Sequence, residues 1–299
     1  MVEKKLISEV CEFAEARGAF GQPCQTGVDG LLVFCDSAPT TCAATLYEPI
    51  MCLVLQGRKE AQLGRRRIEY GAGESVIVSH AVPVVAGVTE ATRELPYAAL
   101  VLRLDLALVR SLYDEIGETE LAGDDLRSID VAETDVALVD AMARLFRISH
   151  DPVETQALAP LVLREIHFRL LRARHGGMLR QLLWRDSPAS RISKAIARIR
   201  SDFTTHILVA ELAETAGMSQ SAFHEHFKTV TSTTPLQYQK DLRLMEARRL
   251  LTAGTKSVSL AAFEVGYESP TQFSREYARK FGVSPRDDKT VPVPAGFPA

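Results

Sequence analysis

The sequence predicts a multidomain α+β protein in which a barrel or sandwich of short strands precedes a helical region and an all-α domain. Three observations predict this order. Short apolar runs such as LLVFC, MCLVLQG and YAALVLRL, separated by glycine and polar turns, fill residues 31–105. From about residue 106 the apolar spacing becomes helical. Finally, a stretch within residues 216–235 recurs within residues 265–285.

The composition is that of a folded chain without a membrane segment. Of the 299 residues, 46% are hydrophobic and 24% are charged, which excludes long disorder and leaves room for about two domains. The N-terminal MVEKKLISEV lacks the apolar core of a signal peptide. No apolar run approaches the roughly 18 residues of a membrane span. We therefore expect a cytoplasmic protein with no membrane partner.

Charge is unevenly distributed along the chain. The net charge is −3, but residues 1–187 hold 20 lysines and arginines against 27 acidic residues, a balance of −7. Residues 188–299 hold 15 against 11, a balance of +4. The C-terminal third is therefore the part expected to meet an anionic partner.

Cysteines occur only in the first 52 residues of the chain. They are odd in number and form no CxxC pair, so reduced thiols are expected rather than a disulfide framework. Small buried hydrophobes are the favoured interpretation, with reactive or redox-sensing thiols as the alternative. The five are Cys11, Cys24, Cys35, Cys42 and Cys52.

One predicted hairpin carries a run of three arginines. In QLGRRRIEY we expect Gly64 at the turn and Arg65 to Arg67 entering the next strand. The run could bind phosphate, but strand alternation would send adjacent side chains to opposite faces. A solvated hairpin tip is therefore the favoured interpretation.

Two apolar helical stripes follow the strand region. The first is expected to begin after a cap at Thr134 and to end at Pro152, and the second to end at Gly176 and Gly177. Both stripes need a partner, either the sheet or a second subunit, so we expect a homodimer contact here. The stripes are Val136, Val139, Met142, Leu145 and Phe146, then Leu158, Leu161, Val162, Ile166 and Leu170.

A third region is expected to begin at Ser187, which can cap a helix with Pro188 in its first turn. From there to Gly282 the sequence indicates helices only. Ile192, Ile196 and Ile199 give the first of these helices an apolar stripe.

The repeat lies inside this third region. AGMSQSAFHEHFKTVTSTTP and VGYESPTQFSREYARKFGVSP share a glycine, a polar turn, an aromatic pair four residues apart and a hydroxyl residue before proline. Phe223 and Phe227 match Phe273 and Tyr277 at an offset of 50. The second copy has one extra residue in its turn.

Each copy has the pattern of a helix-turn-helix motif. A short helix ends at Gly217 or Gly266, and Ser219 or Ser269 opens a second helix whose aromatics face inward. The outward residues are polar, and the second helix of such a motif enters the DNA major groove. The segment PLQYQKDLRLMEARRLLTAG predicts a long helix between the copies. It could hold the two units about one turn, or 10 base pairs, apart on one side of the duplex.

VAELAETAGMSQSAFHEHFK, RLMEARRLL and AAFEVGYESPTQFSREYARKFGVSP resemble the tandem DNA-binding domain of the AraC/XylS family of bacterial transcription regulators. YEPIMCLVLQGRK and YGAGESVIVS are similar to the cupin-like N-terminal domain of one AraC subgroup. The resemblance implies a cupin-like effector-binding β-barrel at 1–110, a helical linker and dimerisation region at 111–186, and a tandem helix-turn-helix domain at 187–289. A flexible tail is expected at 290–299.

The resemblance also implies which residues face DNA. Arg275 suits guanine, Gln272 suits adenine, and Lys228 and Arg279 suit phosphate. Glu225 stands where many family members have arginine, so we expect the second unit to bind DNA more tightly than the first. Ser232 stands where the family often has glycine. The expected DNA-facing residues are Gln220, Ser221, His224, Glu225 and Lys228, then Thr271, Gln272, Ser274, Arg275 and Arg279.

The barrel is expected to bind an unknown small-molecule effector and to use no metal or other cofactor. Metal-binding cupin enzymes need an HxH pair, a glutamate and a later histidine, whereas this region contains only His80. An enzyme is therefore not expected. The polar candidates for the effector pocket are Tyr47, His80, Tyr97 and Arg103.

Double-stranded promoter DNA and RNA polymerase are the implied macromolecular partners. In the working hypothesis, the effector changes how two DNA-binding units are presented to paired sites. The rival hypothesis is a regulator in which an electrophile modifies Cys35, Cys42 or Cys52.

Overall fold

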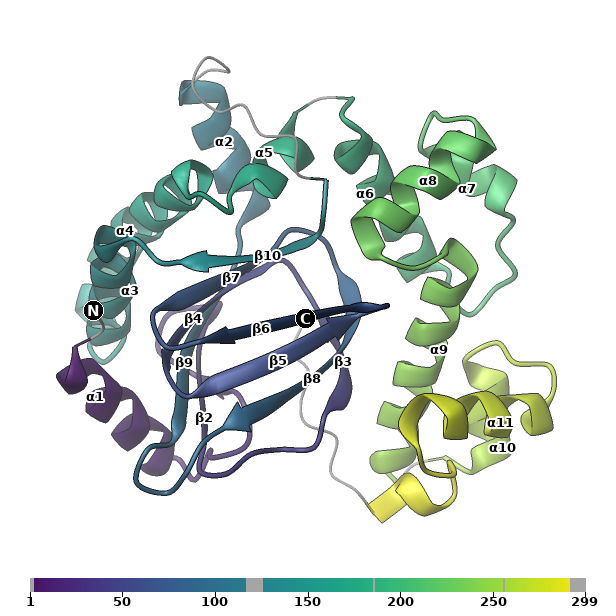
Figure 1. Ribbon diagram of the computed structural model, residues 1–299, viewed down its shortest axis with the longest axis horizontal. Coiled ribbons are helices and arrows are strands. Elements are labelled where there is room, and N and C mark those ends of the chain that lie inside the picture. Colours follow the sequence, from purple (N-terminus) through teal and green to yellow (C-terminus); the bar gives the residue numbers. More distant parts are fainter. Residues whose placement is uncertain (1–2, 117–125, 185, 255, 291–299) are drawn as a thin grey trace.

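The computed structural model describes residues 3–116, 126–184, 186–254 and 256–290. Its N-terminal half contains two antiparallel sheets that face each other, and its C-terminal half is helical (Figure 1). The predicted fold class is confirmed. The strand order of the six-stranded sheet is β1 (Cys24–Gln25), β2 (Leu31–Asp36), β9 (Tyr97–Arg103), β4 (Ile50–Gln56), β7 (Glu74–Val78) and β10 (Ile129–Glu133). The strand order of the four-stranded sheet is β3 (Ala43–Tyr47), β8 (Val82–Glu90), β5 (Arg58–Leu63) and β6 (Arg66–Gly71).

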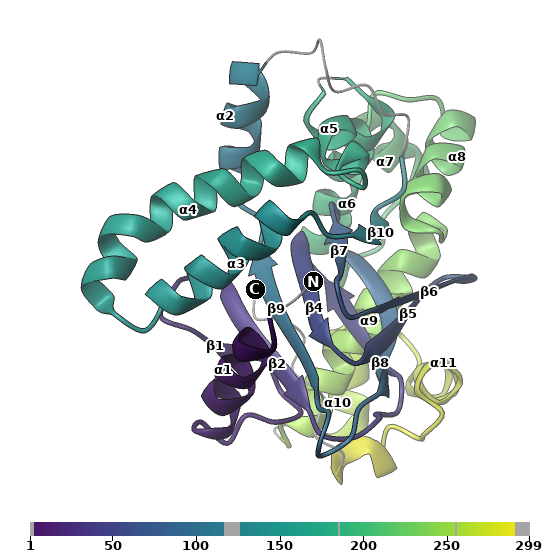
Figure 2. The same cartoon turned by 60° about the vertical axis from the view of Figure 1, so that its left-hand side comes forward.

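Apolar side chains fill both faces of the six-stranded sheet. Between the sheets, Val54, Val76 and Val101 are buried with residues such as Ala61 and Val84 of the smaller sheet. The outer face is covered by helices, as Figures 1 and 2 show. Burial on both sides explains the continuous apolar runs of β4 and β9. The covering helices are α1 (Lys4–Glu15), α2 (Leu106–Ile116), α3 (Val136–Ile148), α4 (Pro152–Arg172) and α5 (Gly177–Leu183).

β10 is a strand in a region that the sequence indicates as helical. Its pairing with β7 runs from Ile129 opposite Val78 to Glu133 opposite Glu74, so it extends the larger sheet. Its five residues are too few to show a strand period just before the two helical stripes that follow it. The chain therefore returns to the barrel before α3 begins.

The start of α3 also differs from expectation. The cap is Asp135, whose Oδ1 accepts a hydrogen bond from the Ala137 amide at 2.8 Å, and not Thr134. A carboxylate competes well for the free amides at a helix start, since it also complements the helix dipole. Pro152 opens α4, because its missing N–H costs nothing in a first turn.

The C-terminal half contains two small helical cores joined by one helix. Ser187 caps α6 (Pro188–Ser201) as expected, accepting from the Ser190 amide at 2.9 Å. In α9 (Pro235–Thr252), Tyr238 and Leu242 belong to the first core and Ala247 and Leu251 to the second. The remaining helices are α7 (Val209–Thr215), α8 (Gln220–Thr231), α10 (Val258–Glu264), α11 (Pro270–Phe281) and the 3-10 turn η2 (Asp287–Thr290). All but the first residue of the expected tail at 290–299 lies outside the described residues.

Specific polar contacts connect the barrel to the helical half. The Tyr238 hydroxyl donates to the Ala81 carbonyl oxygen at 2.8 Å, and Arg200 forms an ion pair with Glu48. The Ser128 amide, just before β10, donates to the Val230 carbonyl oxygen at 3.2 Å. Ala81 and Leu46 also pack on the first helical core. The two halves therefore share a packed interface.

Among the helices in the described part of the chain, none combines the length and the apolar character needed to cross a lipid bilayer.

Candidate nucleic-acid interface and ligand cavity

The second helix of each motif begins in the same way. Ser219 accepts from the amide three residues later at 3.3 Å, and Ser269 does so at the same distance. Gly217 and Gly266 precede these caps with φ values of +62° and +87°. Only glycine adopts such angles at little cost, so each turn needs its glycine.

The aromatic pairs are packed almost identically in the two motifs. The rings of Phe223 and Phe227 lie 5.5 Å apart at 54°, and those of Phe273 and Tyr277 lie 5.4 Å apart at 57°. All four side chains are fully buried. The repeated sequence is therefore a repeated core, which leaves the opposite face of α8 and α11 to solvent.

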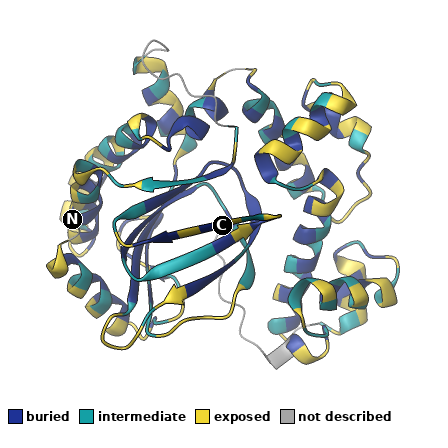
Figure 3. Cartoon of the chain, viewed as in Figure 1, coloured by how far each residue is buried: buried dark blue, intermediate teal, exposed yellow. Residues whose placement is uncertain are grey.

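That opposite face carries the residues predicted to meet DNA. All are exposed except Ser274, which is half-buried and whose hydroxyl donates to the Pro270 carbonyl oxygen at 2.8 Å. Figure 3 shows exposed residues along both helices. Gln272 is exposed, but its amide donates to Glu276 Oε1 at 3.2 Å, so it must leave that contact to reach a base.

The cations on this face have no acidic partner. The side chains of Lys228, Arg275 and Arg279 make no hydrogen bond or ion pair with any residue in the described ranges. By contrast, Lys240 and Lys280 nearby are paired with Glu276 and Asp241, each at 2.9 Å. A cation that binds a DNA phosphate releases a counterion from the DNA. These exposed side chains, which have no partner among the described residues, are the groups that can do so.

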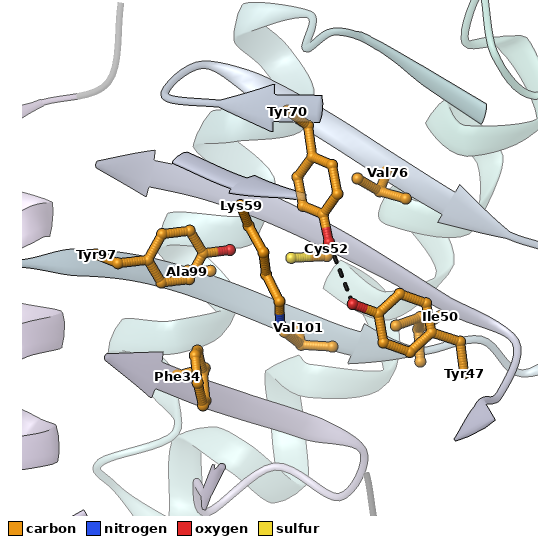
Figure 4. Close-up of a pocket in the computed structure, with 10 residues that line it drawn as sticks. All are labelled: Phe34, Tyr47, Ile50, Cys52, Lys59, Tyr70, Val76, Tyr97, Ala99 and Val101. Carbon is orange, nitrogen blue, oxygen red and sulfur yellow. Dashed lines mark hydrogen bonds between the residues drawn. The ribbon is translucent and has the colours of Figure 1, made fainter. Parts of the chain in front are cut away.

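A second candidate site is the interior of the barrel, drawn in Figure 4. The free space measures about 10 Å³, which is room for roughly one water molecule. Ten side chains surround it, and most are apolar or aromatic. They are Phe34, Tyr47, Ile50, Cys52, Lys59, Tyr70, Val76, Tyr97, Ala99 and Val101.

Three tyrosines supply the polar groups of this cavity. The hydroxyls of Tyr47 and Tyr70 are 3.2 Å apart and form a hydrogen bond with each other. The Tyr97 hydroxyl is buried beside the Cys52 thiol, a weak hydrogen-bonding group, and has no nitrogen or oxygen partner in the described part of the chain. Burial raises the pKa of Tyr70 and of Tyr97 well above the usual value, so both remain neutral donors. An unsatisfied buried donor is costly and marks a place where a ligand acceptor would be favourable.

Lys59 brings a positive charge to the cavity. Its Nζ lies 4.9 Å from the Phe34 ring centroid and 6.0 Å from that of Tyr47, and it forms no ion pair within the described residues. Figure 4 shows its side chain between the rings. Asp36 interacts with Lys59 electrostatically across the adjoining cleft but forms no ion pair with it, so the ammonium against the aromatic faces can still accept an incoming anion.

The cavity adjoins an open cleft of about 360 Å³ that shares Phe34, Tyr47 and Lys59 with it. The far wall of the cleft comes from the helical half through Arg248 and Lys280, among others. Arg248 donates a hydrogen bond to Asp288 at 3.1 Å, and Lys280 forms an ion pair with Asp241. The cleft thus lies between the barrel and the second helix-turn-helix motif.

Two of the four predicted pocket residues lie together, Tyr47 and Tyr97. His80 follows β7 and faces α6, where its Nε2 lies 3.1 Å from the Ala189 carbonyl oxygen. Arg103 lies at the edge of β9, paired with Asp29 at 3.0 Å beside α4. Neither is among the residues that line the cavity. His80 and Arg103 lie at the ends of strands. The direction of their side chains depends on how those ends are oriented, which the sequence pattern does not specify.

Sequence reasoning missed Lys59 and Tyr70 as cavity residues. A signal for both exists in strand alternation, because every second side chain of a strand faces the same side. Lys59 shares its face of β5 with Ala61 and Leu63, and Tyr70 shares its face of β6 with Ile68. The apolar partners are buried in the barrel, so the lysine and the tyrosine point there too.

The three thiols of the rival hypothesis are in unreactive surroundings. Burial raises the pKa of the Cys52 thiol. Cys42 is exposed, but partial desolvation together with Glu60, 3.0 Å from the sulfur, raises the pKa of its thiol. A hydrogen bond with Cys11 and burial raise the pKa of Cys35. Since the thiolate is the reactive form, these surroundings disfavour attack on an electrophile. Nor do the described residues include a cluster of three or more His, Cys, Asp or Glu able to hold a metal ion.

Both halves of the chain are similar to parts of known proteins. The family model of the AraC-type transcriptional regulator N-terminus matches residues 27–178, just over half of the chain, and that of a helix-turn-helix domain matches residues 212–290. Over 102 residues the chain is 33% identical to the HTH-type transcriptional activator RhaS of Escherichia coli O139:H28 (strain E24377A / ETEC). That match covers 34% of this chain and 37% of the relative, so the chain spans little more than a third of its length.

Solved structures of similar fold cover almost the whole chain. Unsaturated fatty acid bound wild-type ToxT from Vibrio cholerae strain SCE256 superposes with a TM-score of 0.56 and 12% identity, covering 91% of this chain and 99% of that one. ToxT from Vibrio cholerae O395 bound to (E)-4-(8-methylnaphthalen-1-yl)but-3-enoic acid gives a TM-score of 0.55 and 12% identity, covering 86% and 96%. At this identity the similarity concerns the fold alone.

Proposed function

This chain belongs to the family of AraC-type transcriptional regulators, and from that premise we propose that it binds promoter DNA sequence-specifically under the control of a small organic acid. The observation that carries the proposal is the pair of matched helices, α8 and α11, with buried aromatic backs and exposed polar faces. Residues 1–110 would hold the effector, 111–186 would link and dimerise, and 187–289 would read DNA. RNA polymerase would be the partner at the promoter.

The two reading helices have different roles in this proposal. Arg275 on α11 contacts a guanine edge, and Lys228 and Arg279 contact phosphates, because all three are exposed and unpaired within the described ranges. On α8, Glu225 is exposed and repels phosphate, so the first unit contributes less affinity. The other proposed contacts are Gln220, Ser221, His224, Thr271, Gln272 and Ser274.

The effector class follows from the chemistry of the cavity. Lys59 offers an unpaired ammonium, Tyr97 an unsatisfied hydroxyl, and the remaining walls are apolar or aromatic. A monocarboxylate with an apolar body matches these groups. Support comes from the ToxT structures, whose ligands are an unsaturated fatty acid and a naphthyl butenoic acid. Because only about 10 Å³ is free in the barrel, the body occupies the adjoining cleft unless side chains move.

We propose a homodimer that uses the exposed side of α4. Three large apolar side chains on this helix are open to solvent: Val153 is 76% exposed, Leu158 42% and Leu161 65%. Leucines this exposed on one helix are costly to leave in water, and a second copy could cover them.

The effector proposal is tested with oleate as the probe, with oleyl alcohol as its uncharged analogue. Oleate should raise the melting temperature of the full chain and the alcohol should not, since a ligand stabilises the state it binds. Lys59→Met should abolish the oleate effect. Lys4→Met, an exposed lysine on α1, should not change it.

DNA affinity is measured in the same samples with a duplex selected by the wild-type chain from a random library. Equal oleate responses in the wild type and Lys59→Met would exclude this effector site while leaving the DNA-binding proposal intact. Failure to enrich any duplex would exclude sequence-specific DNA binding itself.

A further inference from the structure

The β5–β6 hairpin ends in three consecutive arginines, and only one of them is available to a partner. Arg66 donates to the Ile129 carbonyl oxygen at 2.9 Å and lies 3.6 Å from Asp130. Arg67 is paired with Glu60 and Glu69 at 2.5 and 3.1 Å. Arg65, at the turn itself, is exposed and makes no hydrogen bond or ion pair within the described residues. Among the residues that the structure describes, its guanidinium therefore has no partner.

The position of the hairpin is fixed by the helical half. Gly64 has a φ of +59°, and a Cβ at this position would collide with the carbonyl oxygen of Ser232 at the end of α8. The hairpin also lines a cleft of about 270 Å³, through Gln62 and Gly64, that is lined in addition by Thr231 at the end of α8 and by Arg279 of α11. The turn thus lies between the C-terminal ends of the two reading helices.

Figure 2 shows this arrangement from the side. The tip of the β5–β6 hairpin projects between α8 and α11 on the same side of the molecule, while α9 lies behind them. If a duplex contacts both helices, the stretch between its two major-groove segments would run past the side to which this tip projects. The backbone of that intervening stretch presents phosphates to whatever protein group lies there.

We propose that Arg65 is a third DNA contact, made by the barrel domain to the phosphate backbone between the two segments read by α8 and α11. Arginine suits this place because its planar guanidinium donates several hydrogen bonds and remains charged. The acids of the hairpin, Glu60 and Glu69, are already paired with Arg67, so they do not neutralise Arg65. The contact is independent of base sequence, since it reaches phosphate only. This inference rests on the proposed reading of DNA by α8 and α11.

The test uses the full-length chain and two labelled duplexes, one enriched from a random library by the wild type and one of unrelated sequence. Arg65→Ala should weaken binding to both duplexes by about two- to fivefold, as expected for an exposed charge contact. It should also lower the slope of log affinity against log salt by about one. Arg65→Lys should keep the slope, and Arg65→Glu should lose more affinity than the alanine variant.

Arg93→Ala is the matched control. Arg93 is an exposed arginine in the turn between β8 and β9, with no hydrogen bond or ion pair to the residues that the structure describes. In Figure 1 this turn lies at the end of the barrel away from α8 and α11. Its loss should leave affinity and slope unchanged. Melting temperatures of all variants report whether each is folded.

The outcomes separate the inference from the function beneath it. If the wild type binds and Arg65→Ala has the affinity and slope of Arg93→Ala, the third contact does not exist. If Arg65→Ala binds DNA more tightly than the wild type, the Arg65 side chain hinders DNA binding, and the proposal is overturned. If the wild type enriches no duplex, DNA reading by α8 and α11 fails first.

Discussion

His80 at the end of the barrel donates a hydrogen bond to the carbonyl oxygen of Ala189 in the first turn of α6, with 3.1 Å between Nε2 and oxygen. A carbonyl oxygen only accepts, so Nε2 carries the proton and Nδ1 accepts from the Ser79 hydroxyl at 2.8 Å. The imidazole is buried, and burial lowers its pKa to about 4. His80 is therefore a neutral connection between the barrel and the DNA-binding half.

The first prediction concerns pH. The unfolded chain protonates His80 near its ordinary pKa of about 6.5, whereas the folded chain resists protonation until about pH 4. Stability is therefore complete above pH 6.5 and falls as the pH drops toward 4, by up to about 3 kcal/mol from this residue. Denaturant unfolding across that range should give a smaller decline for His80→Gln, whose amide can still donate to Ala189. His175 titrates in the same window and persists in the variant, so the difference isolates His80. If the free energy of unfolding falls equally in the wild type and in His80→Gln, His80 is not a source of this pH dependence.

The second prediction separates base reading from phosphate contact. Arg275→Ala should cost roughly 1 to 3 kcal/mol for the preferred base at one position and relax specificity there. Lys228→Ala should instead weaken binding to all sequences alike and reduce the salt slope by about one. Affinities for a set of single-base variants of the selected duplex measure both effects. A uniform loss for Arg275→Ala would make it a phosphate contact.

The third prediction concerns the backbone at the end of α8. Ser232 is left-handed, with a φ of +56°, at the place where α11 has Gly282 with a φ of +73°. Ser232→Gly should raise the free energy of unfolding by about 0.5 to 1 kcal/mol, because glycine takes this conformation without strain. Gly282→Ala should lower it by a similar amount. Chemical denaturation of both variants decides, and a destabilised Ser232→Gly would mean that its side chain contributes more than its strain costs.

The fourth prediction concerns assembly. Leu161→Glu should convert the proposed dimer to a monomer of 32.9 kDa in sedimentation equilibrium, since a carboxylate would be buried against an apolar surface. Leu95→Glu is the control, because Leu95 is 63% exposed but lies in the β8–β9 turn and not on α4. A wild-type chain that sediments as a monomer would exclude the dimer.

The helical half could be read from the sequence because its signals are local. Glycine turns, serine caps and aromatics four residues apart are each complete within a few residues, and each occurs twice. The barrel was predictable as a class for a similar reason, since its apolar runs are bounded by turns. β10 was not, because IDVAE is short and stands among helical stripes.

Contacts between distant segments had no local signal. Nothing in the neighbourhood of His80 indicates that it meets Ala189 rather than the barrel interior, and nothing around Gly64 indicates Ser232. Such pairs are fixed only when the barrel closes and the halves pack together. The inward position of Lys59 is different, because alternation with Ala61 and Leu63 already indicates it.

Because α9 belongs to both helical cores, the two reading units cannot reach DNA as independent events. In the proposed mode of binding, once α11 has bound, α8 would be held beside its own segment at a high effective concentration, and little further translational entropy would be lost. A weak first unit would then cost little affinity. Its polar face, Glu225 included, would be free to discriminate between sequences while α11 supplies most of the affinity.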